Sequence, residues 1–240
     1  MKALVFAAGL GERMRPLTDT TPKPLLHAGG KPLIAWHLER LAAAGVRDVV
    51  VNTSWLAPRF EATLGDGSRW GLRIHYLYEG ATPLETGGGM LNALALLGDG
   101  EAPFIALNGD IWSDHPLAGL PVPGGSAHLV LVDNPEHNPQ GDFVLRAGGG
   151  VHAGSGARLT FSGIGVYRAR LFHDWRGSIG DVAGAAATPP RFRLAPLLHA
   201  AIARGEVSGE HHRGAWTDVG TPQRLAALDA RLRLGHAGPA

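Results

Sequence analysis

The first 110 residues alternate between short apolar runs and segments with helical periodicity, and this alternation limits the possible folds more than any other feature. The apolar runs predict strands at residues 3–7, 49–51 and 104–107, and alternating apolar residues predict a strand at 72–78. Apolar residues at helical spacing predict helices at residues 32–45, 55–64 and 86–97, the last capped by Thr86. This order is typical of an α/β fold with a doubly wound, mostly parallel sheet. Because such sheets bind ligands beyond the carboxyl ends of their strands, we expect functional loops beginning at Gly9, Asn52, Tyr78 and Asn108.

Beyond about residue 120 the pattern changes to strand-like runs separated by Gly-, Pro- and Asn-rich connections. These runs predict strands at residues 128–132, 143–146 and 163–167, in a mixed or antiparallel layer. Residues 175–192, rich in Gly, Ala and Pro, predict a mobile connection. Further predicted elements are a helix at 194–203, a short strand within 212–219 and a last helix opened by Thr221 and Pro222. Because no clean linker or internal repeat occurs, we expect a single domain over residues 1–240.

The composition excludes several classes of protein. A net charge of +1 with 18% charged residues lacks the excess of positive charge that binding to nucleic acid or an anionic membrane requires. The absence of cysteine excludes disulfides, thiolate zinc sites and cysteine nucleophiles. The N-terminal apolar run is too short for a membrane span and breaks into Gly, Glu and Arg where a signal peptide would be cleaved. We therefore expect a cytoplasmic protein that acts on small molecules.

The loop after the first predicted strand carries the strongest motif in the sequence. It reads AAGLGERMRPLT from Ala7 to Thr18, and Pro22-Lys23-Pro24 follows. Glycines directly after a strand let backbone N–H groups approach a phosphate. The chain has only three lysines, and the flanking prolines restrict the backbone around Lys23. The motif favours a phosphate site over a solvent-exposed turn, while Met14 in place of a third glycine argues against a Rossmann oxidoreductase.

This loop resembles the signature of the sugar-phosphate nucleotidyltransferases, Ala-Gly-x-Gly-x-Arg-x-x-Pro-x-Thr followed by Pro-Lys-Pro. Asn108-Gly109-Asp110 and the segments 161–164 and 216–221 are similar to further parts of that family. The resemblance implies a Rossmann-like nucleotidyltransferase fold with a small mixed-β sugar-binding region. It assigns about residues 1–120 to nucleotide binding, about 121–220 to the sugar, and 221–240 to a C-terminal helix and tail.

The resemblance also implies a reaction. A sugar 1-phosphate attacks the α-phosphorus of a nucleoside triphosphate, and pyrophosphate leaves. The enzyme has to offset repulsion between anions, for which Arg13 and Lys23 are the expected catalytic residues. Asp110 and Asp218 are the expected ligands of Mg²⁺. All four residues are present, which argues against a non-catalytic nucleotide-binding regulator.

The resemblance also implies further site residues, at the positions of this sequence that match the family's motifs. The expected nucleotide-binding residues are Ala8, Gly9, Gly11, Glu12, Arg13, Lys23, Thr86, Gly87 and Gly88. The last three lie in a Gly-rich stretch that reads the base in this family, although close helix packing is an alternative role for its glycines. The expected sugar-binding residues are Asn52, Glu79, Asn108, Asp142, Ser162, Gly163 and Arg193. Arg193 is included because larger relatives have a second phosphate-binding lysine, and this chain has no lysine after Lys31.

Shorter runs resemble one branch of the family, the uridylyltransferases of peptidoglycan recycling. The runs are residues 83–89, 131–135, 141–143, 160–164 and 207–211. This resemblance implies UTP and N-acetylmuramate α-1-phosphate as substrates. The alternatives are another sugar-1-phosphate nucleotidyltransferase, such as one joining mannose 1-phosphate to GTP or glucose 1-phosphate to a uridylyl or thymidylyl group, and a phosphocholine cytidylyltransferase.

Overall fold

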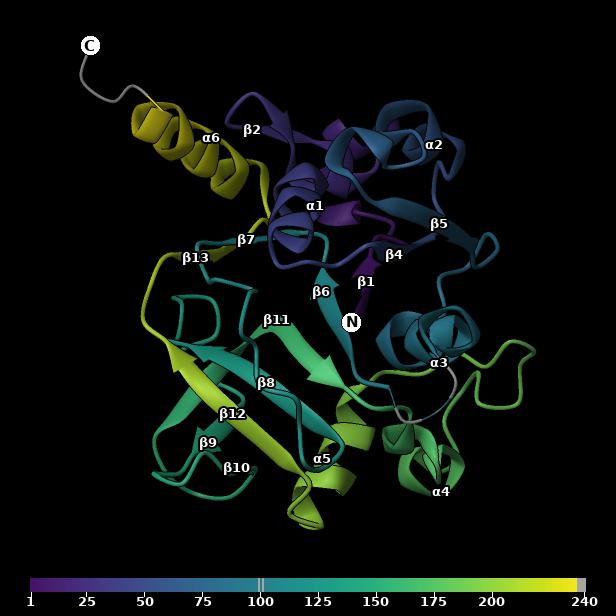
Figure 1. Cartoon of the computed structure of the whole chain (residues 1–240), viewed down its shortest axis with the longest axis vertical. Helices are drawn as coiled ribbons and strands as arrows, with labels where there is room; N and C mark the ends of the chain where they lie inside the picture. Colours follow the sequence, from purple (N-terminus) through teal and green to yellow (C-terminus); the bar gives the residue numbers. More distant parts are fainter. Residues whose placement is uncertain (99, 101, 237–240) are drawn as a thin grey trace.

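The computed structural model describes residues 1–98, 100 and 102–236, and its centre is a mixed sheet (Figure 1). The first half of the chain supplies β1 (Lys2–Phe6), β4 (Asp48–Thr53), β5 (Arg73–Tyr78) and β6 (Phe104–Asn108). These strands are parallel and lie in the order β6, β1, β4, β5. The predicted doubly wound, mostly parallel sheet is therefore confirmed.

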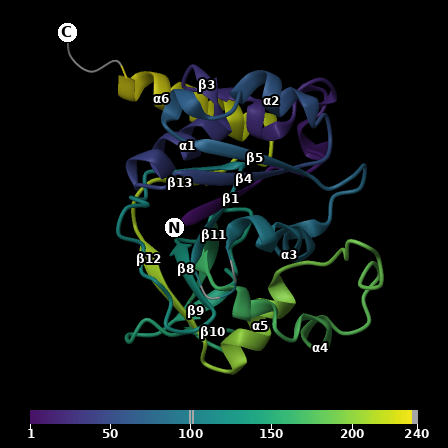
Figure 2. The same ribbon diagram turned by 45° about the vertical axis from the view of Figure 1, so that its right-hand side comes forward.

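Helices cover both faces of the sheet around β1, β4 and β6, which is why these three strands are apolar on both sides. Helices α1 (Leu33–Ala43) and α2 (Pro58–Leu64) lie on one face, and α3 (Glu85–Leu97) lies on the other (Figure 2). Side chains alternate along a strand, so Val5 packs in the core with α1 while Leu4 packs in the core with α3. The polar residues of β1, β4 and β6 therefore lie at the ends of these strands.

The second half of the chain joins the same sheet through β11 (Arg158–Tyr167), which is antiparallel to β6. Strand β11 also pairs with β8 (Ala127–Val132) and β9 (Phe143–Leu145). Strand β10 (Val151–His152) pairs with β9, and β12 (Val207–His212) runs parallel to β8. The predicted mixed layer is confirmed. Strand β12 was not predicted because its sequence, Val-Ser-Gly-Glu-His-His, has one apolar residue.

A separate antiparallel pair brings the C-terminal segment back to the end of β6. Strand β7 (Ile111–Ser113) follows β6 almost directly and pairs with β13 (Trp216–Asp218). Helix α6 (Pro222–His236) then packs near β2 (His27–Ala28), which pairs with β3 (Lys31–Pro32); Figure 1 shows α6 beside β2. The predicted short strand and last helix are confirmed, and the end of the predicted tail, residues 237–240, lies outside the described residues.

Local differences from the sequence predictions occur in three places. The loop that was predicted to begin at Gly9 contains short 3-10 helices at Glu12–Met14, Leu17–Asp19 and Lys23–Leu25. Thr86 does not cap α3, because the helix begins at Glu85 with Leu84 as the N-cap. The connection at 175–192 contains α4 (Trp175–Ile179), and α5 (Ala195–Ala203) follows it. In the part of the chain that the structure describes, no helix is long and apolar enough to cross a membrane.

Candidate active site

Two cavities adjoin at the carboxyl ends of the parallel strands, where sheets of this kind bind ligands. The first has a volume of about 440 Å³ and lies among the loops that follow β1, β4, β5 and β6. The second has a volume of about 430 Å³ and is lined by residues of β9, β11 and α5. Phe6, Thr86 and Asn108 line both cavities. A molecule bound in one cavity therefore lies next to a molecule bound in the other.

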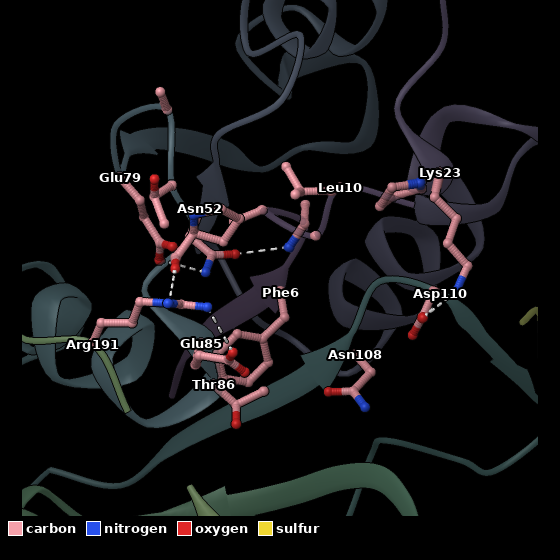
Figure 3. Close-up of a pocket in the computed structure, with 17 residues that line it drawn as sticks. Phe6, Leu10, Lys23, Asn52, Glu79, Glu85, Thr86, Asn108, Asp110 and Arg191 are labelled. Atoms are coloured by element: carbon pink, nitrogen blue, oxygen red, sulfur yellow. Dashed lines mark hydrogen bonds and ion pairs between the residues drawn. The ribbon is translucent and has the colours of Figure 1, made fainter. Parts of the chain in front are cut away.

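The loop after β1 contributes Ala8, Gly9 and Lys23 to the first cavity (Figure 3). Gly11 has a φ of 67°, a left-handed conformation that favours glycine, and its carbonyl accepts a hydrogen bond from Thr18 Oγ1 at 2.8 Å. The predicted phosphate loop is therefore held in a defined shape by its own contacts. Glu12 and Arg13 are exposed and, with Gly11, are not among the residues that line the cavity.

Lys23 points along the first cavity toward the acidic residue that follows β6 (Figure 3). Its Nζ donates a hydrogen bond to Asp110 Oδ2 at 2.5 Å. The lysine side chain is only 11% exposed, whereas the aspartate side chain is 38% exposed. The buried lysine stem thus carries a single compact charge to the cavity wall, beside a carboxylate that an incoming cation can reach.

Asp218 reaches the same region from the other end of the chain. The amide of its neighbour Val219 donates to the carbonyl of Asp110 at 2.8 Å, because β13 pairs with β7. Asp218 Oδ1 accepts a hydrogen bond from Arg224 Nη1 at 2.5 Å, and His137 Nε2 lies 3.0 Å from the same oxygen. The fold therefore brings together two aspartates that are 108 positions apart in the sequence, Asp110 in the turn directly before β7 and Asp218 at the end of β13.

These two aspartates fit a divalent cation that is shared with a phosphate substrate. Within residues 1–98, 100 and 102–236, no group of three or more His, Cys, Asp or Glu side chains could hold a metal ion by itself. Two carboxylates are nevertheless sufficient for a cation that takes its remaining ligands from phosphate oxygens and water. Each carboxylate also has a basic partner, Lys23 or Arg224, that neutralises it.

Asn52 and Glu79, predicted to contact the sugar, line the first cavity and not the second. Asn52 Oδ1 accepts a hydrogen bond from the Ala7 amide at 2.7 Å, and its Nδ2 donates to Glu79 Oε1 at 2.7 Å (Figure 3). Glu79 Oε2 accepts from the Leu84 amide at 2.9 Å. Burial raises the pKa of Glu79. The pair therefore ties the loop after β1 to the segment before α3, and the predicted sugar contact of these two residues stays a prediction.

Gly87 and Gly88, predicted to read the base, lie inside α3 and pack against the chain before α5. Their amides both donate to the Phe192 carbonyl, at 2.9 and 3.0 Å. A Cβ atom on Gly87 would come within 2.6 Å of the Phe192 ring, and one on Gly88 within 2.3 Å of the Pro190 carbonyl oxygen. These contacts favour the packing role that the sequence left as an alternative. Thr86 faces both cavities, and its Oγ1 accepts from the Leu194 amide at 3.1 Å.

The remaining predicted sugar residues divide into those at the second cavity and those away from it. Asn108, Asp142 and Gly163 line the second cavity. Ser162 does not, because its buried Oγ donates to the Val130 carbonyl at 2.7 Å and accepts from the Ile164 amide at 3.2 Å. Arg193 lines neither cavity, and its side chain is 80% exposed, with Nε 3.9 Å from Glu85 Oε2.

Sequence reasoning missed Arg191 and Glu85 on the wall of the first cavity (Figure 3). Arg191 Nη2 donates to Glu85 Oε1 at 3.2 Å, and its Nε donates to the Pro83 carbonyl at 3.1 Å. Glu85 has a φ of 62°, which a residue with a side chain rarely adopts. No sequence motif pointed to Arg191, because it lies in a Gly-, Ala- and Pro-rich stretch. Its contact with α3 joins residues that are about 100 positions apart in the sequence.

Comparisons with known proteins agree with this geometry. Residues 2–120 match the family model of nucleotidyl transferases. The chain is 48% identical over 239 residues to N-acetylmuramate alpha-1-phosphate uridylyltransferase of Neisseria meningitidis, across 96% of this chain and 97% of that protein. It is 38% identical over 247 residues to the protein of the same name from Caulobacter vibrioides, across 96% of each.

A solved structure shows the same fold at low sequence identity. It is a Bacillus anthracis protein assigned as a glucose-1-phosphate thymidylyltransferase, with a TM-score of 0.79 and 18% identity, and the match covers 97% of this chain and 95% of that one. The sheet, the two adjoining cavities and a relative that is 48% identical along almost its whole length lead to one conclusion: this chain belongs to the nucleotidyl transferase family.

Proposed function

We propose that this protein transfers a uridylyl group from UTP to N-acetylmuramate α-1-phosphate, giving UDP-N-acetylmuramate and pyrophosphate in peptidoglycan recycling. The two relatives named N-acetylmuramate alpha-1-phosphate uridylyltransferase are 48% and 38% identical to the chain over 96% of its length. The single observation that carries the proposal within the structure is the pair of cavities with a shared wall at Phe6, Thr86 and Asn108. A reaction that joins two phosphorylated molecules needs two adjoining sites of this kind.

We assign UTP to the first cavity and the sugar to the second. The phosphate loop residues Ala8, Gly9 and Lys23 line the first cavity, which suits a triphosphate. The second cavity is lined by Phe143, Phe161 and Tyr167, together with the polar groups of Asn108 and Asp142. Apolar ring faces combined with a few polar groups suit the mixed surface of a sugar.

The chemistry that follows is an in-line displacement. An oxygen of the sugar phosphate forms a bond to the α-phosphorus of UTP, and the bond from that phosphorus to the bridging oxygen of the pyrophosphate breaks. The attacking phosphate is already ionised near neutral pH, so no catalytic base is required. Lys23 binds the α-phosphate and offsets the repulsion between the two anions. Arg13, exposed on the phosphate loop, binds the leaving pyrophosphate through its planar guanidinium.

Asp110 and Asp218 would hold Mg²⁺. When bound, the ion supplies positive charge to phosphate oxygens. Lys23 and Arg224 neutralise these two carboxylates. Arg191, which lines the first cavity, and Arg193, two residues further, are the side chains available to replace the second phosphate lysine of larger relatives.

We further propose that residues 1–240 act as one domain, because β11 of the second half pairs directly with β6 of the first. The nucleotide part would extend to about residue 120 and the sugar part from about 121 to 220. The reaction is expected in the cytoplasm, where UTP is available.

The test is a pyrophosphate-release assay of four nucleoside triphosphates against a panel of sugar 1-phosphates. UTP with N-acetylmuramate α-1-phosphate is expected to give the highest kcat/KM. A preference for GTP with mannose 1-phosphate, or for CTP with phosphocholine, would overturn the proposal while leaving membership of the family intact.

A further inference from the structure

The second cavity has to recognise a charge if the proposed acceptor is correct. N-acetylmuramate differs from N-acetylglucosamine by a lactyl ether on the sugar, and this ether ends in a carboxylate. Burying a carboxylate without a donor or a cation is costly, so an enzyme that selects this sugar needs a partner for it inside the sugar cavity. The inference below therefore rests on the proposed function.

The two other charged side chains that line this cavity, Asp142 and Arg158, each make hydrogen bonds to other groups. The carboxylate of Asp142 has the wrong sign, and it accepts hydrogen bonds from the Phe161 amide at 2.8 Å and from Asn138 Nδ2 at 3.2 Å. Arg158 Nη2 donates to the carbonyls of Ala153 and Gly154, at 3.2 and 3.3 Å. These contacts hold the guanidinium group of Arg158 at the turn that precedes β11.

His199 is the remaining candidate. It lies on α5, on the helix face that also brings Ala195 and Leu198 to the cavity, and the residue is exposed. Its ring packs beside Phe143 of β9, with ring centroids 5.7 Å apart, and both ribbon views show α5 beside β9 (Figures 1 and 2). Among the described residues, neither of its ring nitrogens has a hydrogen-bond partner. A ligand in the cavity can therefore take an N–H of this imidazole.

His199 also lies on the correct side of the cavity for this role. The wall shared with the nucleotide cavity, formed by Phe6, Thr86 and Asn108, is where the two phosphates meet. His199 belongs to the part of the lining that the nucleotide cavity does not share. A sugar whose phosphate lies at the shared wall projects its ring substituents toward this unshared part.

We propose that His199 binds the lactyl carboxylate of the acceptor through a ring N–H, and that this contact makes the enzyme prefer N-acetylmuramate 1-phosphate to N-acetylglucosamine 1-phosphate. A neutral imidazole donates one such bond, and an imidazolium donates either of two with a favourable charge. His199 is thus a specificity-determining residue, separate from the groups that act on the phosphates.

The experiment measures kcat/KM for both sugar phosphates, with UTP held at saturation, in the wild-type enzyme and in four variants. His199→Phe, which keeps an aromatic ring beside Phe143 but has no N–H donor, is expected to lower the ratio of the two kcat/KM values about tenfold, as the loss of a hydrogen bond to a charged group does. His199→Arg, which keeps a cationic donor, is expected to hold the ratio within about twofold of the wild type. Arg158→Gln, and His173→Gln as an exposed histidine outside the cavity, should leave the ratio unchanged.

The outcomes separate this inference from the proposed function. A wild-type enzyme without a preference for N-acetylmuramate 1-phosphate overturns the proposed function and the inference together. A wild-type preference that survives in His199→Phe, or that is lost in Arg158→Gln instead, overturns the inference alone. An equal fall in kcat/KM for both substrates in His199→Phe leaves the ratio unchanged, assigns the histidine a structural role and also overturns the inference.

Discussion

The two cavities differ in how their polar groups are used. Around the first, Asn52 and Glu79 bond to each other and to the backbone at both sides, and Lys23 is fixed against Asp110. Around the second, aromatic rings from two strands form much of the wall, and His199 stands beside them with its nitrogens unbonded among the described residues. Reaction chemistry needs groups held in fixed positions at rigid strand ends. Selection of an acceptor needs groups that are free to bond to it.

The largest expected effect tests where the reaction takes place. Chelation should lower turnover to background, and Mg²⁺ should restore it, if Asp110 and Asp218 are the ligands of the ion as proposed. The pyrophosphate-release assay with and without chelator measures this. Asp142→Asn, in the second cavity, should keep the same dependence on Mg²⁺ while raising KM for the sugar phosphate. Turnover that resists chelation would contradict the metal assignment.

Lys23→Ala should lower kcat by about 10²–10³-fold, the loss typical of one preorganised charge at a reacting centre. The control is Lys2→Ala, whose exposed ammonium only caps the Leu96 carbonyl at the opposite end of β1. Both variants should unfold at denaturant concentrations close to that of the wild type, which equilibrium unfolding measures. Near-wild-type turnover in Lys23→Ala would remove the lysine from the mechanism.

Asn52→Ala separates the two cavities directly. It leaves the Ala7 amide and Glu79 Oε1 without a partner, so the free energy of unfolding should fall by about 1–3 kcal/mol. KM for UTP should rise, because the phosphate loop loses its tie to the segment before α3, while KM for the sugar phosphate should change little. The opposite pattern, with only the sugar phosphate affected, would support the sugar contact predicted from the sequence.

The smallest expected effect is a pH dependence of stability with opposite signs in the two halves. Burial raises the pKa of Glu79, so its contribution to stability is greatest below the usual glutamate range and is lost as the pH rises through the raised value. Glu210 behaves oppositely: despite burial, hydrogen bonds from His115 and His128 lower its pKa, so its contribution is present at neutral pH and is lost on acidification.

Urea unfolding of Glu79→Gln and Glu210→Gln between pH 4 and pH 7 measures this difference. Relative to the wild type, Glu79→Gln should gain stability as the pH rises, whereas Glu210→Gln should lose it, by about 1 kcal/mol at pH 7. Parallel curves for the two variants would show that the halves do not differ in this respect.

Much of the fold was predictable because its cause is local in the sequence. The apolar runs of β1, β4 and β6 are buried on both faces, and short apolar runs of this kind are typical of strands inside a parallel sheet. The phosphate loop was also predictable, since the left-handed turn at Gly11 and the prolines around Lys23 act within a few residues. Strand β12 was not, because its polar sequence becomes a strand only through pairing with β8.

The site shows the same division residue by residue. The sequence by itself determined which residue types are available for phosphate and metal in the proposed reaction, namely Lys23 and the two aspartates, because their chemistry follows from charge and from local motif. Only the tertiary structure decided that Asn52 and Glu79 brace the first cavity, that Gly87 packs against Phe192, and that Arg191 lines the first cavity and His199 the second. The physical reason is that those roles depend on contacts between segments far apart in the chain, such as α3 with the residues before α5, and sheet topology rather than local spacing brings such segments together.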